Sequence, residues 1–107
     1  MNLNNEELVK VVNIDNVNEN KQIVAMNQKF KTICFVFDEG KGLADHRHNG
    51  YASILIYEGS VKINFENGEK YELNKGDFMP FDARITHNVI ASVKSKVLVT
   101  ISESLSN

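Results

Sequence analysis

The chain has 107 residues, a common length for a single domain, and 42% of them are apolar and 24% charged, which is typical of a folded globular protein. Twelve Lys and Arg against 14 Asp and Glu give a formal net charge of -2, and the basic residues form no cluster, which argues against nucleic-acid binding. One cysteine excludes an internal disulfide, and no apolar run approaches membrane-spanning length, so we expect a cytoplasmic protein without a membrane partner.

The first twenty residues are crowded with asparagine, which competes with regular backbone hydrogen bonding and favours turns and caps. We expect an N-terminal arm over residues 1–20. Residues 6–12 fit a short helix or an edge strand equally well, and the sequence does not decide between them.

From residue 21 onward, short β-prone runs alternate with turn residues at the spacing of a sandwich or barrel. No stretch with helical periodicity longer than about ten residues follows Val12. We therefore predict one all-β domain over residues 21–107. Its expected strands are residues 21–25, 31–37, 51–57, 61–65, 69–73, 77–80, 85–91 and 96–101.

Two of these runs form the clearest hairpin. Val61, Ile63 and Phe65 alternate with polar residues, as in a strand with one face in contact with water. Asn67-Gly68 separates this run from the next and suits a type I′ turn. The run 51–57 is apolar on nearly both faces, so it should be a central strand or lie at a subunit contact.

Three histidines are the main indication of function. On an extended chain His46 and His48 project to the same face, and His87 shares its side of a predicted strand with Ile85 and Val89. Three neutral imidazoles that meet can hold a divalent ion and leave positions open for water or substrate. The alternatives are a solvated loop for His46 and His48, and a strand histidine hydrogen-bonded to backbone for His87.

The two histidine segments resemble the two motifs of the cupin superfamily, small β-barrels of jelly-roll (double-stranded β-helix) type. In the first motif, a glycine (Gly40 or Gly42) precedes His46-Arg47-His48, and the next strand closes on Glu58-Gly59; in the second, Gly76 and Pro80 precede His87. The resemblance covers residues 32–101. It implies a cupin barrel with His46, His48 and His87 as ligands of a divalent transition metal (Zn, Ni, Mn or Fe), or the same pocket without metal.

One departure from the family pattern concerns the carboxylate ligand. Its position falls on Ala52, as in short single-domain bacterial cupins that lack the glutamate of the first motif. A metal held by neutral imidazoles alone would keep its double charge and favour an anionic ligand. We take Arg84, on the loop before His87, and Tyr51, beside Ala52, as candidate ligand contacts; for Arg84 the alternative is an ordinary surface charge.

These expectations lead to two functions. The first is a cupin whose histidine-lined pocket binds a divalent metal and a small, anionic metabolite. The second is a metal-dependent enzyme of the dioxygenase or isomerase type that uses His46, His48 and His87 as ligands. The sequence names no reaction. We also expect a homodimer, because a small open barrel has edge strands to protect and the arm could add a strand to a partner's sheet.

Overall fold

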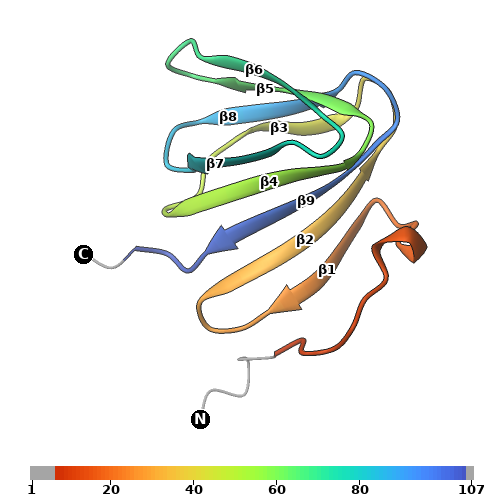
Figure 1. Cartoon of the computed structure of the whole chain (residues 1–107). Helices are drawn as coiled ribbons and strands as arrows, with labels where there is room; N and C mark the ends of the chain where they lie inside the picture. The colour runs from red at the N-terminus through yellow and green to blue at the C-terminus, as the bar shows by residue number, and fades with distance from the viewer. Residues whose placement is uncertain (1–6, 106–107) are drawn as a thin grey trace.

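The computed structural model describes residues 7–105, which form a two-layered β structure (Figure 1). One short 3-10 helix, η1 (Ile14–Asn16), precedes the strands. The strands within the described residues are β1 (Lys21–Met26), β2 (Phe30–Phe37), β3 (Gly42–His46), β4 (Tyr51–Glu58), β5 (Ser60–Phe65), β6 (Lys70–Asn74), β7 (Phe78–Asp82), β8 (His87–Ala91) and β9 (Ser95–Ser102).

Two antiparallel sheets make up the two layers. The larger sheet has the strand order β1-β2-β9-β4-β7, and the smaller has the order β3-β8-β5-β6. Consecutive strands are often placed in different sheets, so the chain crosses between the layers, as in a jelly roll. The predicted all-β jelly-roll barrel is therefore confirmed.

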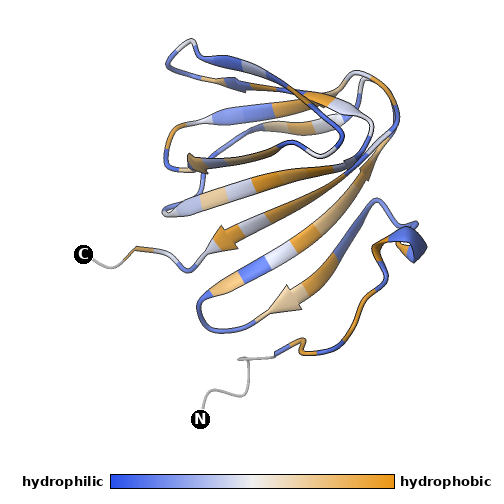
Figure 2. Cartoon of the chain, viewed as in Figure 1, coloured by the Kyte–Doolittle hydropathy of each residue, from blue (hydrophilic) through white to orange (hydrophobic). Residues whose placement is uncertain are grey.

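The core lies between the sheets and is built by the two-residue alternation of the strands. On β4 the buried side chains are Ala52, Ile54 and Ile56, and the intervening side chains are only half-buried. Complete burial of an aliphatic side chain stabilises the fold by about 1.5–3 kcal/mol. Figure 2 shows the hydrophobic residues concentrated along β2, β4 and β9. The prediction that run 51–57 is internal is confirmed, since β4 lies between β9 and β7.

All eight expected strands are present, but β3 was not among the predicted strands. This strand carries one inward-packed apolar residue, Leu43, among exposed positions, and it lies at the edge of the smaller sheet. An edge strand needs little hydrophobic patterning, because only one side of its backbone is paired. Strand β3 ends at His46, one of the three histidines of the sequence analysis.

The predicted hairpin between β5 and β6 is present, with Val61 opposite Leu73. The predicted type I′ turn is wrong, because that turn needs positive φ at Asn67 as well, and positive φ in the described residues occurs only at glycines. The Gly68 amide donates to the Phe65 carbonyl, and Gly68 itself has φ +97°. This is the three-residue loop in which a glycine follows an ordinary turn.

Part of the N-terminal segment packs on the larger sheet. Val17 is 2% exposed, and Lys96 donates from Nζ to the carbonyl oxygen of Ile14 at 2.8 Å. Of the residues expected to form a helix or an edge strand, residue 6 lies outside the described residues. Leu8 makes a single antiparallel bridge with Met26 at the free edge of β1, as an edge strand would.

Candidate functional site

His46 and His87 are cross-strand partners at the end of the smaller sheet. The pairing of β3 with β8 runs from Leu43 opposite Val89 to His46 opposite His87, with an irregularity between the two pairs. Two residues of β3 there oppose a single residue of β8, which is the geometry of a β-bulge. The centroids of the two imidazole rings are 4.3 Å apart.

The two rings differ in burial. His87 is 3% exposed and lies on the same side of β8 as buried Val89, so the prediction that it points into the barrel is confirmed. His46 is exposed at the end of β3. The pair therefore runs from the barrel interior to its open end.

Each of these rings is fixed by a hydrogen bond to the main-chain carbonyl two residues earlier. The Nδ1 atom of His46 lies 2.7 Å from the carbonyl oxygen of Ala44, and Nδ1 of His87 lies 2.8 Å from that of Ile85. A carbonyl oxygen only accepts, so Nδ1 donates the proton in both rings and Nε2 of the neutral ring keeps a lone pair.

The Nε2 atom of His87 is not completely buried. Among residues 7–105, every fully buried side-chain nitrogen or oxygen has a hydrogen-bond partner. The only hydrogen bond of the His87 ring to a described residue is made by Nδ1. Its Nε2 atom therefore keeps some contact with solvent, and in the neutral ring it is an available acceptor.

Aromatic side chains surround the inner ring. The ring centroids of Phe81 and Phe65 lie 5.0 and 5.7 Å from that of His87, and 5.6 Å from each other. Burial among them lowers the pKa of His87 from its usual 6.5. The hydrogen bond to Ile85 opposes this shift, while the neighbouring His46 reinforces it. His87 is consequently neutral at pH 7, the form that accepts a hydrogen bond or binds a metal.

His48 is placed differently from the other two histidines. Its backbone amide donates to the Ala83 carbonyl at 2.8 Å, and its Nε2 atom lies 2.7 Å from the carbonyl oxygen of Ser102. Strand β3 ends at His46, so the alternation that would put residues 46 and 48 on one face does not continue. The structure thus brings together two of the three predicted ligands.

No group of three or more His, Cys, Asp or Glu side chains within residues 7–105 is arranged to hold a metal ion. At the position where the family pattern has a carboxylate, Ala52 faces inward, 8% exposed, opposite Phe81 of β7 and Ile101 of β9. The metal-binding role of His46, His48 and His87 therefore stays a prediction.

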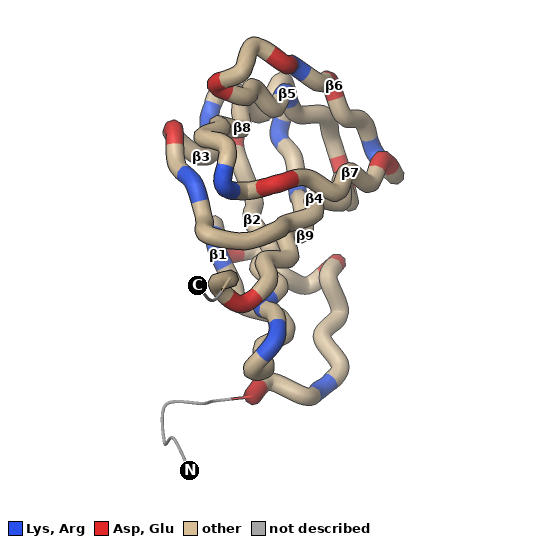
Figure 3. Tube along the Cα trace, turned by 90° about the vertical axis from the view of Figure 1, so that its left-hand side faces the viewer, with Lys and Arg blue, Asp and Glu red and all other residues tan. Residues whose placement is uncertain are grey.

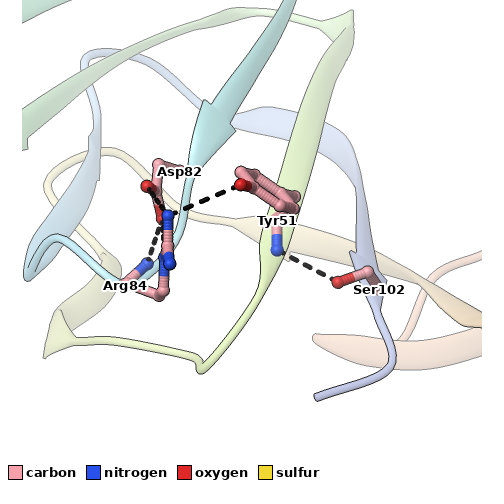
Figure 4. A network of polar contacts seen from close by, with 4 residues as sticks. All are labelled: Tyr51, Asp82, Arg84 and Ser102. Carbon is pink, nitrogen blue, oxygen red and sulfur yellow. Dashed lines mark hydrogen bonds and ion pairs between the residues drawn. The ribbon is translucent and has the colours of Figure 1, made fainter. Parts of the chain in front are cut away.

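The candidate ligand contacts Arg84 and Tyr51 belong to one polar network at the barrel rim (Figure 4). Arg84 donates to the two carboxylate oxygens of Asp82 from Nε at 2.8 Å and from Nη2 at 2.6 Å. The guanidinium carbon lies 5.3 Å from the centroid of the Tyr51 ring, and the Tyr51 amide donates to Ser102 Oγ at 3.0 Å.

Asp82 holds the arginine in place. The bidentate bond from Arg84 lowers the pKa of Asp82 from 3.8 to about 2, and the same contact raises the pKa of Arg84. Sequence reasoning missed Asp82. The signal for it was the Asp-Ala-Arg spacing, because an aspartate in a turn accepts from the amide two residues on, as Asp82 does from Arg84 at 3.0 Å.

A sequence profile described as the cupin domain matches residues 34–102, nearly two thirds of the chain. The protein belongs to the cupin family. A comparison with curated proteins gives no match.

Several solved structures share this fold closely. An RmlC-like cupin from Desulfovibrio desulfuricans is 25% identical, with a TM-score of 0.80, and the alignment covers 91% of this chain and 99% of that one. A protein of unknown function from Streptococcus pyogenes is 21% identical, with a TM-score of 0.76 and coverage of 96% and 95%. KdgF from a Halomonas species is 26% identical, with a TM-score of 0.69 and coverage of 79% and 80%.

Two further findings concern the charge distribution and the helices of this cupin. Lys and Arg are interspersed with Asp and Glu along the trace in Figure 3. None of the helices in the described part of the chain has the length and hydrophobicity needed to cross a lipid bilayer.

Proposed function

We propose that this cupin binds a small metabolite at the end of its barrel, at the site formed by His46 and His87, together with a divalent transition metal. One observation supports this most directly. Each ring donates Nδ1 to a main-chain carbonyl two residues earlier, which fixes the tautomer and leaves Nε2 as an acceptor. Metal-binding histidines commonly donate their other nitrogen to an oxygen in this way.

The histidines brought together by the fold supply only part of a metal site. His46 and His87 supply two neutral nitrogen ligands, whereas catalytic zinc sites carry three protein ligands. His48 would become the third only by giving up its Nε2 bond to Ser102 or by using its other ring nitrogen. A bound divalent ion would supply a Lewis acid with its full double charge, because Ala52 contributes no carboxylate. This favours an anionic metabolite.

The protein's own side chains suit the binding of a small molecule with a polar end and an apolar body. In the pocket without metal, the Nε2 atoms of His46 and His87 accept hydrogen bonds from a donor group at the polar end. Phe65 and Phe81 form an apolar wall beside the buried ring and exclude water from it.

Metal binding by single variants tests the proposal. The protein is purified without a histidine tag, stripped with a chelator and titrated with Zn²⁺ and Ni²⁺, with the bound metal measured by mass spectrometry. We expect one metal per chain in the parent protein. Loss of one imidazole, in His46→Ala or His87→Ala, should weaken binding by about tenfold or more. An unmodified protein that takes up neither ion would refute the metal part of the proposal.

The variant His48→Ala separates the two candidate functions. Unchanged binding in His48→Ala supports a two-imidazole site, with the remaining positions filled by water or metabolite. Binding lost to the same extent as in His87→Ala indicates a three-histidine centre, the donor set of the dioxygenase or isomerase alternative. In that case a search for turnover becomes the next step.

We also propose that the protein is a homodimer joined at the free edge of β1. Leu8 donates its amide to the Met26 carbonyl at 3.0 Å, so residue 8 lies beside this edge. Val9 and Val11 are 85% and 97% exposed. Valines with this exposure are costly in a monomer and suited to contact with a second copy.

A further inference from the structure

A hollow at the barrel rim lies between the only two arginines of the chain. Its volume is about 240 Å³, and it is lined by Arg47, His48, Asn49 and Arg84. The rings of His46 and His87 do not line it, so it is distinct from the site proposed above. This volume is below the usual range for drug-sized ligands, so a small group is the appropriate occupant.

Main-chain hydrogen bonds join the two loops that carry the arginines. The His48 amide donates to the Ala83 carbonyl at 2.8 Å, and the Ala83 amide donates to the Gly50 carbonyl at 3.0 Å. Ala83 is 1% exposed, so this junction is buried. These hydrogen bonds hold the backbone of residues 47–50 against residues 83 and 84. The two arginines therefore lie on adjacent loops.

Arg84 is also fixed at its side chain. Its Nε and Nη2 atoms donate to Asp82, and its guanidinium stacks over the Tyr51 ring (Figure 4). Among the described residues, Nη1 of Arg84 makes no hydrogen bond, and the side chain is 46% exposed. The Nη1 donor is therefore available for a ligand without a further loss of side-chain entropy.

The charges of the hollow determine the kind of ligand. Arg84 is neutralised by Asp82, whereas Arg47 is exposed and forms no ion pair with a described residue. The two guanidinium groups and one carboxylate leave a single positive charge. A ligand group with one negative charge matches this excess.

We infer that the hollow between Arg47 and Arg84 is a binding site for a carboxylate group of a small molecule. Arg47 supplies the unpaired charge, and Arg84 supplies an oriented N–H donor. Asp82 and Tyr51 are positioning residues, since they act on the ligand only through Arg84.

Arginine signals in NMR spectra give a direct test. The chain contains two arginines, so a ¹H–¹⁵N spectrum holds two Nε–H resonances, which the variants Arg47→Lys and Arg84→Lys assign. The protein is titrated with sodium acetate, and with sodium chloride at the same ionic strength. We expect saturable acetate-dependent shifts at Arg84, at Arg47 and at the amides of residues 47–49, with no equivalent response to chloride.

Variants then identify the groups responsible. Loss of a charged hydrogen-bond donor should weaken acetate binding by about tenfold in both Arg47→Ala and Arg84→Ala. The control Lys62→Ala removes an exposed charge from β5 and should leave binding unchanged. Identical shifts with acetate and chloride, or a Lys62→Ala variant as impaired as Arg47→Ala, would overturn the site. Tighter binding of phosphate than of acetate would overturn the assignment to a carboxylate.

Discussion

Acidification should destabilise the protein through His87. Burial lowers the pKa of this group in the folded state, whereas in the unfolded chain it returns to about 6.5. Below pH 6.5 the unfolded state therefore binds more protons than the folded state. The stabilisation is complete above pH 6.5 and is lost as the pH falls below this value.

The size of the effect follows from a single proton. When His87 is protonated only in the unfolded state, the free energy of unfolding falls by about 1.4 kcal/mol per pH unit. When the folded state also binds part of this proton, the fall is smaller. Asp82 does not interfere, because its own proton uptake falls between its ordinary pKa of 3.8 and about 2. A series between pH 7.5 and 5.0 isolates the contribution of the histidines.

Urea unfolding of the chelator-treated protein measures this loss. The matched control is His87→Asn, whose side-chain amide can still donate to the Ile85 carbonyl but does not titrate. We expect the unfolding free energy of the parent to fall over this range and that of His87→Asn to fall less, with a difference of up to about 1.4 kcal/mol per pH unit. Parallel curves for the two proteins would refute the assignment of the pH dependence to His87.

Three further predictions concern packing and assembly. In Gly42→Ala, the added Cβ would lie 1.8 Å from the Val89 carbonyl oxygen, so β3 should separate from β8, with zinc binding reduced as strongly as in His46→Ala; unimpaired binding would contradict this. Ile54→Ala, at a position 1% exposed, should lower the unfolding free energy by about 2–5 kcal/mol in urea, and a loss below 1 kcal/mol would argue against the packing of β4. The double variant Val9→Asp, Val11→Asp should be monomeric by light scattering while the parent is dimeric, and equal masses would exclude this dimer contact.

Strands with alternating or continuous apolar residues could be predicted from the sequence. Strand β3 could not, because its place depends on pairing with β8 rather than on its own side chains. The same limit affects the candidate site. That His87 faces inward follows from its two-residue spacing from Val89, within one regular strand. His48 lies beyond the end of β3, where the contact with Ser102 directs the ring.

The β-bulge in β3 determines which side chain, Asp45 or His46, lies opposite His87. Regular pairing continued from Leu43 would put Asp45 opposite His87, and the buried imidazole would then have an anionic neighbour. With the bulge, Asp45 accepts a hydrogen bond from Asn88 at 2.8 Å, and His46 lies opposite His87. A one-residue slip of this edge strand would replace the pair of imidazoles by a carboxylate–imidazole pair, with an unchanged sequence. The chemical character of the barrel end thus depends on strand register.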